Sequence, residues 1–452
     1  MKKVLSSSLS VTHFRTIIPF SKSLVNVGWL FFDKIFRMAT GMIVGIWLAR
    51  YLGPSEYGLL NYVNVFPLIL APLASLGVNN ILVSEIPIQN VEAVDRLVRT
   101  TVSLKFLSGL ISFFLILIAC NIIHASNQQL ILLISISSLG LIVQCFDAVD
   151  VYFQSIQKIH YSIIPKVISF SLTTAVRIYG LTAHYHLSFF IAISICDILI
   201  SYLTIYWIYL TQHGHSIFSF LFDKAIVQRL IQLAWPLMLA EFFIFIYMRI
   251  DQLMLKYLAD SHELGRYSAA LRLSEVWYFV AGAITMSFYP SIIALRAHDY
   301  NGYLNRYQKL LNILAVCGIT IGIVFSILAN GITSMLYGPE YEGVGPILSI
   351  HIWTGLFVFI AVGTNNWFIV ENMQRFLLGR TIMGAVVNAG LNLFLIPLYG
   401  AIGASVATLL AQLCAAYLTN GLYSRTKEVF ELQSNALLFV PRFLISRLRQ
   451  IL

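Results

Sequence analysis

Long apolar runs constrain the fold of this 452-residue chain more than any other feature. Residues 310–339 contain no charged side chain, and a helix of about 20 apolar residues is long enough to cross a bilayer. Hydrophobic residues make up 58% of the chain and charged residues 11%, which lies outside the usage of soluble globular proteins. Because a backbone in lipid must satisfy its own hydrogen bonds, the sequence predicts an all-α integral membrane protein.

The apolar runs, with their Gly, Pro and charged punctuation, predict twelve transmembrane helices. The predicted spans are residues 24–50, 59–83, 101–123, 128–154, 161–183, 187–210, 229–257, 266–290, 310–336, 344–370, 376–396 and 400–424. The first span is the least apolar, because Asp33, Lys34 and Arg37 interrupt it. The polar stretches between the spans are too short to hold a separate soluble domain.

The positions of Lys and Arg predict the orientation, since cytoplasmic loops retain basic residues. One side of the membrane receives Lys2, Lys3, Arg15, Lys22, Arg96, Arg99, Lys158, Lys224, Arg229, Arg296, Arg306, Arg375, Arg380, Arg425, Lys427, Arg442, Arg447 and Arg449. The opposite side keeps only Arg50, Lys256 and Arg266. This asymmetry predicts that both termini are cytoplasmic, and it accounts for the net charge of +9 without any binding of nucleic acid.

Several other features are expected to be absent. The five cysteines lie singly in apolar runs, which indicates neither a disulfide framework nor a metal cluster. We expect no cofactor, since the chain has no Walker lysine motif, no GxSxG and no HExxH, and the spacing of His184 and His186 is too weak a signal for a metal. We also expect no cleaved signal peptide, because the first apolar run begins late and contains charges.

A short internal repeat suggests two similar halves. The segment RYLGPSEYG at residues 50–58 matches KYLADSHELG at residues 256–265 with one insertion, which aligns Glu56 with Glu263 and Gly58 with Gly265. The match predicts two six-helix lobes related by a pseudo-twofold axis along the membrane normal, an architecture of transporters. We expect a basic tail at residues 1–23, lobes at residues 24–212 and 213–424, and an amphipathic basic tail at residues 425–452 on the cytoplasmic leaflet.

Two stretches carry a family resemblance. The segment LARYLGPSEYGLLNY at residues 48–62 resembles the signature of bacterial polysaccharide-unit flippases of the Wzx type, within the multidrug/oligosaccharidyl-lipid/polysaccharide exporter superfamily. The segments NAGLN at residues 388–392 and IPLYGAIGASVAT at residues 396–408 are similar to the eleventh-to-twelfth helix signature of that family. The sequence departs from the family at Gln412, where a glutamate is expected, so that acid has no coupling role here.

The resemblance implies a function for the chain. Such flippases move an undecaprenyl-diphosphate-linked oligosaccharide from the cytoplasmic to the periplasmic leaflet of the bacterial inner membrane, for assembly of O-antigen lipopolysaccharide or a related polysaccharide. The implied partners are the lipid-linked oligosaccharide, membrane lipids, and the polymerase and chain-length proteins of the same pathway. Two alternatives stay open: a cation-coupled multidrug exporter of the same superfamily, and a membrane polymerase or ligase. The short outer loops argue against the enzyme.

Ionisable groups within the spans are the candidate functional residues, because each costs roughly 2.5 to 3.5 kcal/mol to place in a membrane. Asp33 and Arg37 are spaced i, i+4, so an internal ion pair is the alternative to a functional role. Lys34 has no such local partner. Lys166 and Arg177 lie on one helix face; Lys166 is close enough to the cytoplasmic end to extend to the interface, whereas Arg177 lies deeper.

The seventh and eighth spans hold the densest set of charges. Counted from the turn near Ser261, Arg249, Asp251 and Arg272 are predicted at one depth, with Glu275 a turn further in and Glu241 nearer the midplane. One interpretation is a salt-bridge network between the two helices. The other is a ligand site, since guanidinium groups bind phosphates with two parallel hydrogen bonds.

Further polar groups have two interpretations each. Gln144, Asp147, Asp150 and Gln154 form a stripe in the fourth span that either packs against other helices or accepts hydrogen bonds from sugar hydroxyls. Asp197 stands alone in the sixth span, as a coupling group or a hydrogen-bonded buried acid. We expect Lys34, Arg37, Arg177, Arg249 and Arg272 to bind the diphosphate or glycan, and Asp33, Asp197, Glu241, Asp251 and Glu275 to serve in coupling or gating.

Overall fold

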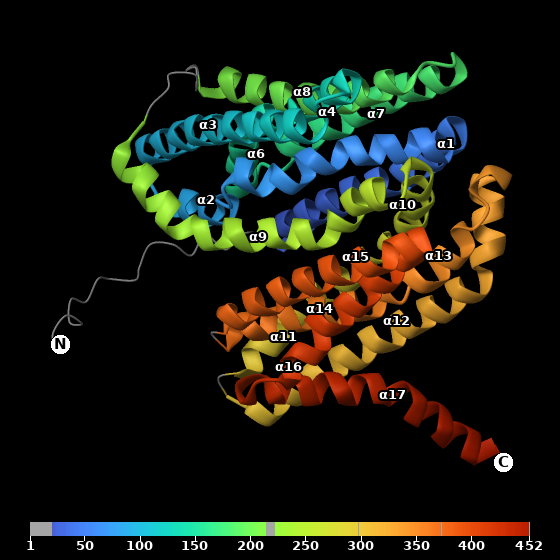
Figure 1. Cartoon of the computed structure of the whole chain (residues 1–452). Coiled ribbons are helices and arrows are strands. Elements are labelled where there is room, and N and C mark those ends of the chain that lie inside the picture. The colour runs from blue at the N-terminus through green and yellow to red at the C-terminus, as the bar shows by residue number, and fades with distance from the viewer. Residues whose placement is uncertain (1–19, 214–221, 297, 372, 452) are drawn as a thin grey trace, which may run out of the picture.

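The computed structural model describes residues 20–213, 222–296, 298–371 and 373–451, and in these residues the secondary structure is entirely helical. The N-terminal half contains α1 (Phe20–Ser75), α2 (Asn79–Glu85), α3 (Val91–Ile123), α4 (Gln128–Ser138), α5 (Gly140–Val143), α6 (Asp147–Ser155), α7 (His160–Thr182) and α8 (Leu187–His213). The C-terminal half contains α9 (Lys224–Leu258), α10 (Ser261–Glu275), α11 (Tyr278–Arg296), α12 (Tyr300–Tyr337), α13 (Val344–His351), α14 (Thr354–Val370), α15 (Gln374–Leu413), α16 (Thr419–Gly421) and α17 (Lys427–Ile451). Figure 1 shows the two halves as neighbouring helical bundles.

The long apolar helices agree with an integral membrane protein. Within the described ranges, nine helical segments are long and apolar enough to cross a membrane. Two of these segments, which include α1 and α15, each contain two predicted spans. Non-helical backbone separates the two spans at Gly53 in α1 and at Gly400 in α15, where φ is +69° and +54°. Such positive φ angles are most easily adopted by glycine. The helix α7 corresponds to the predicted span 161–183, so the segments are consistent with the twelve predicted spans.

Three predicted spans are broken helices in the structure. The span 128–154 is divided into α4, α5 and α6, the span 266–290 is divided between α10 and α11, and the span 344–370 is divided between α13 and α14. The last two breaks lie close to a side-chain contact, because Ser274 Oγ is 2.7 Å from His351 Nδ1. Broken helices are tolerated at membrane depth where neighbouring helices satisfy the freed backbone groups.

Polar side chains cap the helices at both ends of the bundle. Asn90, Asp223 and Asp299 accept hydrogen bonds from the first backbone N–H groups of α3, α9 and α12. Asp260 does the same for α10 at the opposite end. These caps satisfy amide groups that the helix itself leaves without an acceptor.

The packing of buried residues divides the bundle into three cores. One core, in the N-terminal half, includes Leu82, Val98 and Tyr209, and the first part of α9 joins it through Leu230 and Ala234. A second core unites α11, α12 and α14 with α17 of the C-terminal half, and it buries Val429 and Ala436 of α17. The described part of the amphipathic tail therefore packs on α12 and its neighbours. The side chains of Arg442, Arg447 and Arg449 lie outside the described residues.

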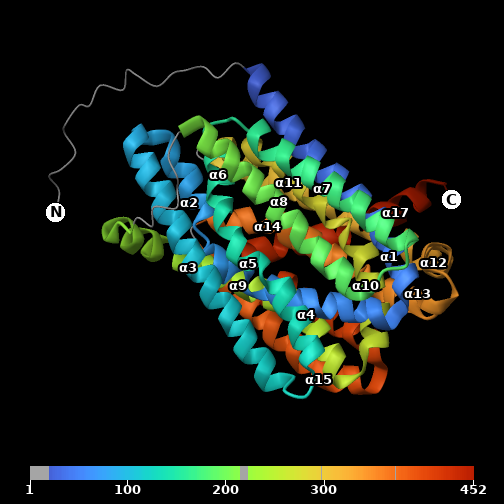
Figure 2. The same ribbon diagram turned by 90° about the horizontal axis from the view of Figure 1, so that it is seen from above.

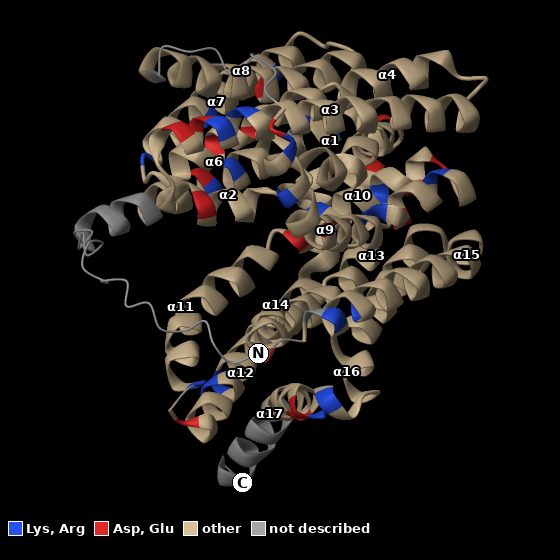
Figure 3. Cartoon of the chain, turned by 90° about the vertical axis from the view of Figure 1, so that its left-hand side faces the viewer, with Lys and Arg blue, Asp and Glu red and all other residues tan. Residues whose placement is uncertain are grey.

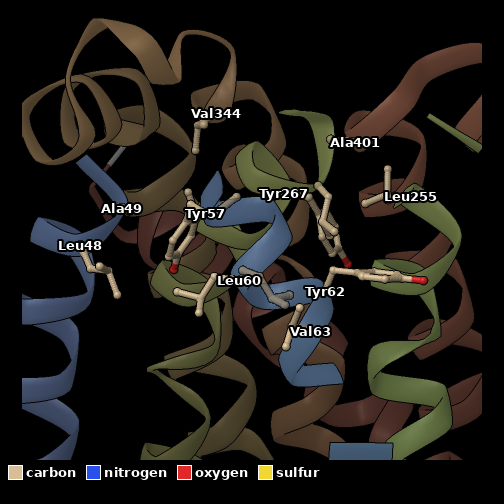
Figure 4. Close-up of a cluster of buried hydrophobic side chains, with 14 of the residues drawn as sticks. Leu48, Ala49, Tyr57, Leu60, Tyr62, Val63, Leu255, Tyr267, Val344 and Ala401 are labelled. Atoms are coloured by element: carbon tan, nitrogen blue, oxygen red, sulfur yellow. The ribbon is translucent and has the colours of Figure 1, made fainter. Parts of the chain in front are cut away.

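The third core joins the two halves. It combines Tyr57 and Tyr62 of α1 with Leu255 of α9, Tyr267 of α10 and Val344 of α13, as Figure 4 shows. Figures 1 and 2 show α1 beside α9 and α10, its main packing partners in the C-terminal half. We call the end of the bundle with this shared core the closed end; it contains the loops at Gly53, Asp260 and Gly338. The other end, where each half has its own core, is the open end.

Candidate functional site

A cleft separates the two halves beside α1, α10 and the start of α11. It has a volume of about 350 Å³ and is lined by Arg37, Met38, Gly41, Met42, Arg272, Glu275, Val276 and Phe279. The predicted site residues Arg37 and Arg272 thus line one space from opposite halves, with Glu275 beside Arg272. We call this space the central cleft.

Arg37 has partners on three helices. Its Nε donates to Asp33 Oδ1 at 2.8 Å, as the i, i+4 spacing predicts, and its Nη1 is 3.8 Å from Asp197 Oδ2 on α8. Its Nη2 donates to the carbonyl oxygen of Lys166 on α7, and its guanidinium lies over the ring of Phe170 at 4.9 Å. The guanidinium is therefore held in one position, with two carboxylates nearby.

Asp197 has polar partners on two other helices. Besides its contact with Arg37, it accepts a hydrogen bond from Ser169 Oγ at 2.8 Å. Sequence spacing could not reveal this pairing, because Arg37 and Asp197 are separated by most of the N-terminal half. Of the two interpretations of Asp197, the structure favours the hydrogen-bonded acid.

Arg272 crosses between the halves without a carboxylate partner in the described part of the chain. It projects from α10, donates through Nη2 to the carbonyl oxygen of Gly41 on α1, and donates through Nη1 to Tyr57 Oη at 3.3 Å. Its guanidinium lies against Gly45, where a methyl group would leave it no room. Because these two acceptors are uncharged, they do not neutralise the guanidinium of Arg272, which can still bind an anion.

The charges of α9 and α10 form separate contacts rather than one network. Arg249 Nη2 donates to Glu275 Oε2 at 2.9 Å, and this salt bridge joins α9 to α10 next to the cleft. Asp251 forms no salt bridge within the described residues. Its buried carboxylate accepts from the hydroxyls of Tyr267 and Thr408, so its role here is to join α9, α10 and α15.

Three further predicted residues have few partners. Arg177 donates to Ser194 Oγ at 3.3 Å and lies near enough to Asp197 and Arg272 for their charges to act on it. Lys34 is exposed, and no carboxylate of the described chain lies within 4 Å of it. Glu241 is half-buried on α9 and has no hydrogen-bond or ion-pair partner among the described residues.

Lys105 is a buried cation that was not among the predicted site residues. This lysine of α3 is 1% exposed and forms an ion pair with Asp147 of α6, while Asn79 bridges the two by donating to Asp147 Oδ2 at 3.1 Å. A lysine inside the third predicted span was itself the signal that should have identified it. The neighbouring acid Asp150 is bound by Ser162 and Lys166.

These contacts bear on the polar stripe of the span 128–154, which was expected either to pack against other helices or to bind sugar hydroxyls. Asp147 and Asp150 are 5% and 6% exposed, so the structure favours helix packing over recognition of sugar hydroxyls. Figure 3 shows acidic and basic residues close together around α6 and α7. The described residues contain no group of three or more His, Cys, Asp or Glu side chains placed to hold a metal.

Comparison with protein families supplies an independent result. The model of a family described as polysaccharide biosynthesis protein matches residues 23–296, which is more than half of the chain. The chain belongs to this family. A curated relative, the probable flippase AglR of Haloferax volcanii, is 32% identical over 174 residues. That match covers 37% of this chain and 36% of the relative, so it spans about a third of the relative's length.

Solved structures share the fold of this polysaccharide biosynthesis family member at low sequence identity. The lipid II flippase MurJ in an inward closed conformation has a TM-score of 0.71 and 16% identity, with 94% of this chain and 93% of that chain covered. A multidrug resistance MATE family transporter of the MOP superfamily, in an inward-facing conformation, has a TM-score of 0.68 and 15% identity, with 90% and 99% covered. The outward-facing conformation of a multidrug resistance MATE family transporter has a TM-score of 0.57 and 13% identity, with 92% of this chain and 96% of that chain covered. These likenesses show that the chain shares the fold of these proteins.

Proposed function

We propose that this protein is a flippase that moves a lipid-linked oligosaccharide across a membrane by alternating access. The observation that carries the proposal is the central cleft, which Arg37 of one half and Arg272 of the other both line. A substrate with a diphosphate, a glycan and a polyprenyl tail requires cations in a cavity that reaches lipid. The cleft provides the cations, and the tail stays in the bilayer between the halves.

The arginines act as phosphate ligands in this proposal. Arg272 is held only by neutral acceptors, Gly41 and Tyr57, which a phosphate oxygen outcompetes because a charge-assisted hydrogen bond is roughly twice as strong as a neutral one. Arg37 is positioned by Asp33 and Asp197, so it meets the substrate with little reorganisation. In this proposal Arg177 and the exposed Lys34, which lies three residues before Arg37 on α1, add positive charge for the substrate.

We propose Glu241 as the first coupling candidate. The acids Asp33, Asp197 and Glu275 are paired with arginines, and Asp251 is bound by hydroxyl groups. Glu241 alone of the five proposed acids has no partner among the described residues, so its protonation or cation binding does not have to break a salt bridge. An ion gradient or the membrane potential is the proposed energy source, since the chain has no ATP-binding motif.

The proposed substrate is an undecaprenyl-diphosphate-linked repeat unit, carried from the cytoplasmic to the periplasmic leaflet of a bacterial inner membrane with both termini in the cytoplasm. The proposed pathway is assembly of O-antigen or a related surface polysaccharide, with the polymerase and chain-length proteins as partners. Membership of the polysaccharide biosynthesis family and the relative described as a probable flippase support this assignment. The loop asymmetry of Lys and Arg supports the orientation.

Oriented inner-membrane vesicles from a strain without other flippases test the function. The measurement is cleavage of the lipid-linked glycan by an impermeant glycosidase added to the periplasmic face. With the protein present the glycan becomes accessible; without it, or with Arg272→Ala, it stays protected. Lys309→Ala is the matched control, since Lys309 is exposed on α12 and does not line the cleft. Equal accessibility with and without the protein would reject the flippase, and export of cationic dyes would then indicate a drug exporter.

A further inference from the structure

A second groove lies on the outside of α1, near the closed end. It has a volume of about 430 Å³, and its main lining residues are Ile43, Ile46, Trp47 and Arg50 of α1 with Leu181 and His184 at the end of α7. Figure 1 shows α1 and α7 reaching the same end of the bundle. The central cleft lies on the face of α1 that carries Arg37 and Gly41, next to Arg272. Because each residue turns the helix by about 100°, the opposite face of α1 carries Ile43, Trp47 and Arg50. The groove is therefore separate from the central cleft.

Aromatic side chains place this groove at the level of a membrane interface. Trp47 is 44% exposed, and Tyr179 and Tyr185 are exposed nearby. Tyr51 Oη donates to the carbonyl oxygen of Tyr185 at 3.0 Å, which joins α1, just before its break at Gly53, to the loop after α7. Trp and Tyr with exposed rings are typical of the boundary between hydrocarbon and headgroups.

The groove changes from apolar to cationic along its length. Ile43 is 68% exposed and belongs to the hydrocarbon side, whereas Arg50 is exposed seven residues later, about 10 Å along the helix. No carboxylate of the described residues lies within 4 Å of the Arg50 guanidinium; the acid of the adjacent loop, Glu340, lies beside Gly53. The ring of His184 lies 5.8 Å from that of Tyr51, tilted by 34°, and it lines the groove together with Arg50.

We propose that this groove binds an anionic phospholipid of the leaflet at the closed end. An acyl chain lies along Ile43 and Trp47, and the phosphate lies at Arg50 with His184 beside it. The exposed apolar strip fits an acyl chain, and the guanidinium at interface depth has no carboxylate partner among the described residues. The groove should therefore bind a lipid with a negative headgroup more tightly than a zwitterionic one. A bound lipid at this position braces the junction between α1 and α7 and does not occupy the central cleft.

The fluorescence of Trp47 provides the test. The full-length protein is placed in vesicles of phosphatidylcholine with a small fraction of brominated lipid, either phosphatidylglycerol or phosphatidylcholine, and the signal of Trp47→Phe is subtracted because the chain has seven tryptophans. We expect brominated phosphatidylglycerol to quench Trp47 with an apparent affinity about fivefold higher than brominated phosphatidylcholine, the value for one basic residue at a membrane surface. Arg50→Gln should remove this preference.

Matched variants separate a built site from general surface charge. Lys256→Gln removes a cation at the same end of the bundle and should leave the preference intact; an equal loss in Lys256→Gln and Arg50→Gln would overturn the proposal. His184 has φ +56°, a conformation that asparagine tolerates, so His184→Asn tests the imidazole without altering the backbone and should lower the preference. Quenching without preference between the two lipids, or a preference that excess inorganic phosphate removes, would also overturn it.

Discussion

Gly58 and Gly265, the two aligned glycines of the internal repeat, pack reciprocally at the closed end. Gly58 lies against the backbone of Ser261, and Gly265 lies against the backbone of Pro54, so that neither has room for a methyl group. Pro54 lies four residues before Gly58, and Ser261 lies four residues before Gly265. Each glycine therefore contacts the residue four positions before the other glycine. A twofold relation between the two repeats produces this pattern.

This reciprocal packing predicts a large effect of a single methyl group. Gly58→Ala and Gly265→Ala each force backbone against backbone, and overpacking of this kind typically costs about 1 to 3 kcal/mol. Gly331→Ala is the matched control, because nothing lies within 4 Å of the added carbon and alanine favours a helix by about 1 kcal/mol. We expect the melting temperature in detergent to fall for the first two variants and to be maintained or increased for the third. Unchanged melting of Gly58→Ala would contradict the close contact.

A histidine at the closed end predicts a pH dependence. His124 follows α3, and its Nε2 lies 2.8 Å from Tyr62 Oη of α1 and 3.0 Å from Tyr257 Oη of α9. Burial, together with the nearby charge of Lys256, lowers the pKa of His124 below its usual 6.5. Between the lowered pKa and 6.5 the unfolded chain binds more protons than the folded chain, so stability rises with pH in this window.

The contribution of His124 is therefore complete above about pH 6.5 and is lost as the pH falls through the lowered pKa of the folded protein. Melting curves at pH 7.5 and at successively lower pH should show a loss of stability that is smaller in His124→Gln. His298→Gln, at an exposed position of the open end, should behave like the parent protein. If the two variants show the same pH dependence, His124 is not responsible for it.

The fold was predictable where its signal is local. A membrane span is a run of apolar residues, and the Asp33–Arg37 pair is one helical turn, so both can be read from the sequence. The helix breaks near Trp277 and Trp353 have no proline at the break, and they depend on packing such as the contact of Ser274 with His351.

The sequence allowed the charged residues of the candidate site to be identified, but it allowed only some of their interaction partners to be predicted. Charges within apolar spans identified Arg37 and Arg272, which line the central cleft. The contacts of Arg272 with Gly41 and Tyr57, and of Arg37 with Asp197, connect segments far apart in the chain, and spacing carries no information about them. Spacing likewise placed Asp251 at the depth of Arg249 and Arg272, but its carboxylate accepts hydrogen bonds from hydroxyl groups instead.

The buried pair of Lys105 and Asp147 predicts strong destabilisation when one partner is removed. Lys105→Met leaves Asp147 as a buried carboxylate without its cation, and loss of one member of such a pair costs about 3 to 5 kcal/mol. The double variant Lys105→Met with Asp147→Asn should recover much of this loss, because no uncompensated charge remains. Melting temperature and yield of inserted protein are the measurements. A double variant no more stable than Lys105→Met would argue against the ion pair as the cause.

The loop asymmetry predicts a labelling pattern for single cysteines in a background without the native ones. Cysteines at Ser55 and Pro339, at the closed end, should react with an impermeant thiol reagent added outside the cell membrane. Cysteines at Arg99 and Lys224, at the open end, should react only after permeabilisation. The physical reason is the retention of Lys and Arg on the cytoplasmic side. The reverse pattern would invert the orientation, and a mixed pattern would reject the twelve-span topology.

The last prediction separates a ligand role of Arg37 from a structural one. Arg37→Ala should abolish the glycosidase accessibility described above while the protein remains inserted, and Arg37→Lys should restore it only partly, because lysine lacks the planar fork that binds phosphate bidentately. The exchange Asp33→Arg with Arg37→Asp keeps the net charge and the i, i+4 pair, but it moves the guanidinium one helical turn, about 6 Å, away from Asp197 and the carbonyl of Lys166. If Arg37 binds substrate in the central cleft, the exchange variant should be stable and inactive. If the pair serves only to join charges within α1, the exchange should restore activity, and that outcome would remove Arg37 from the proposed site while leaving Arg272 in place.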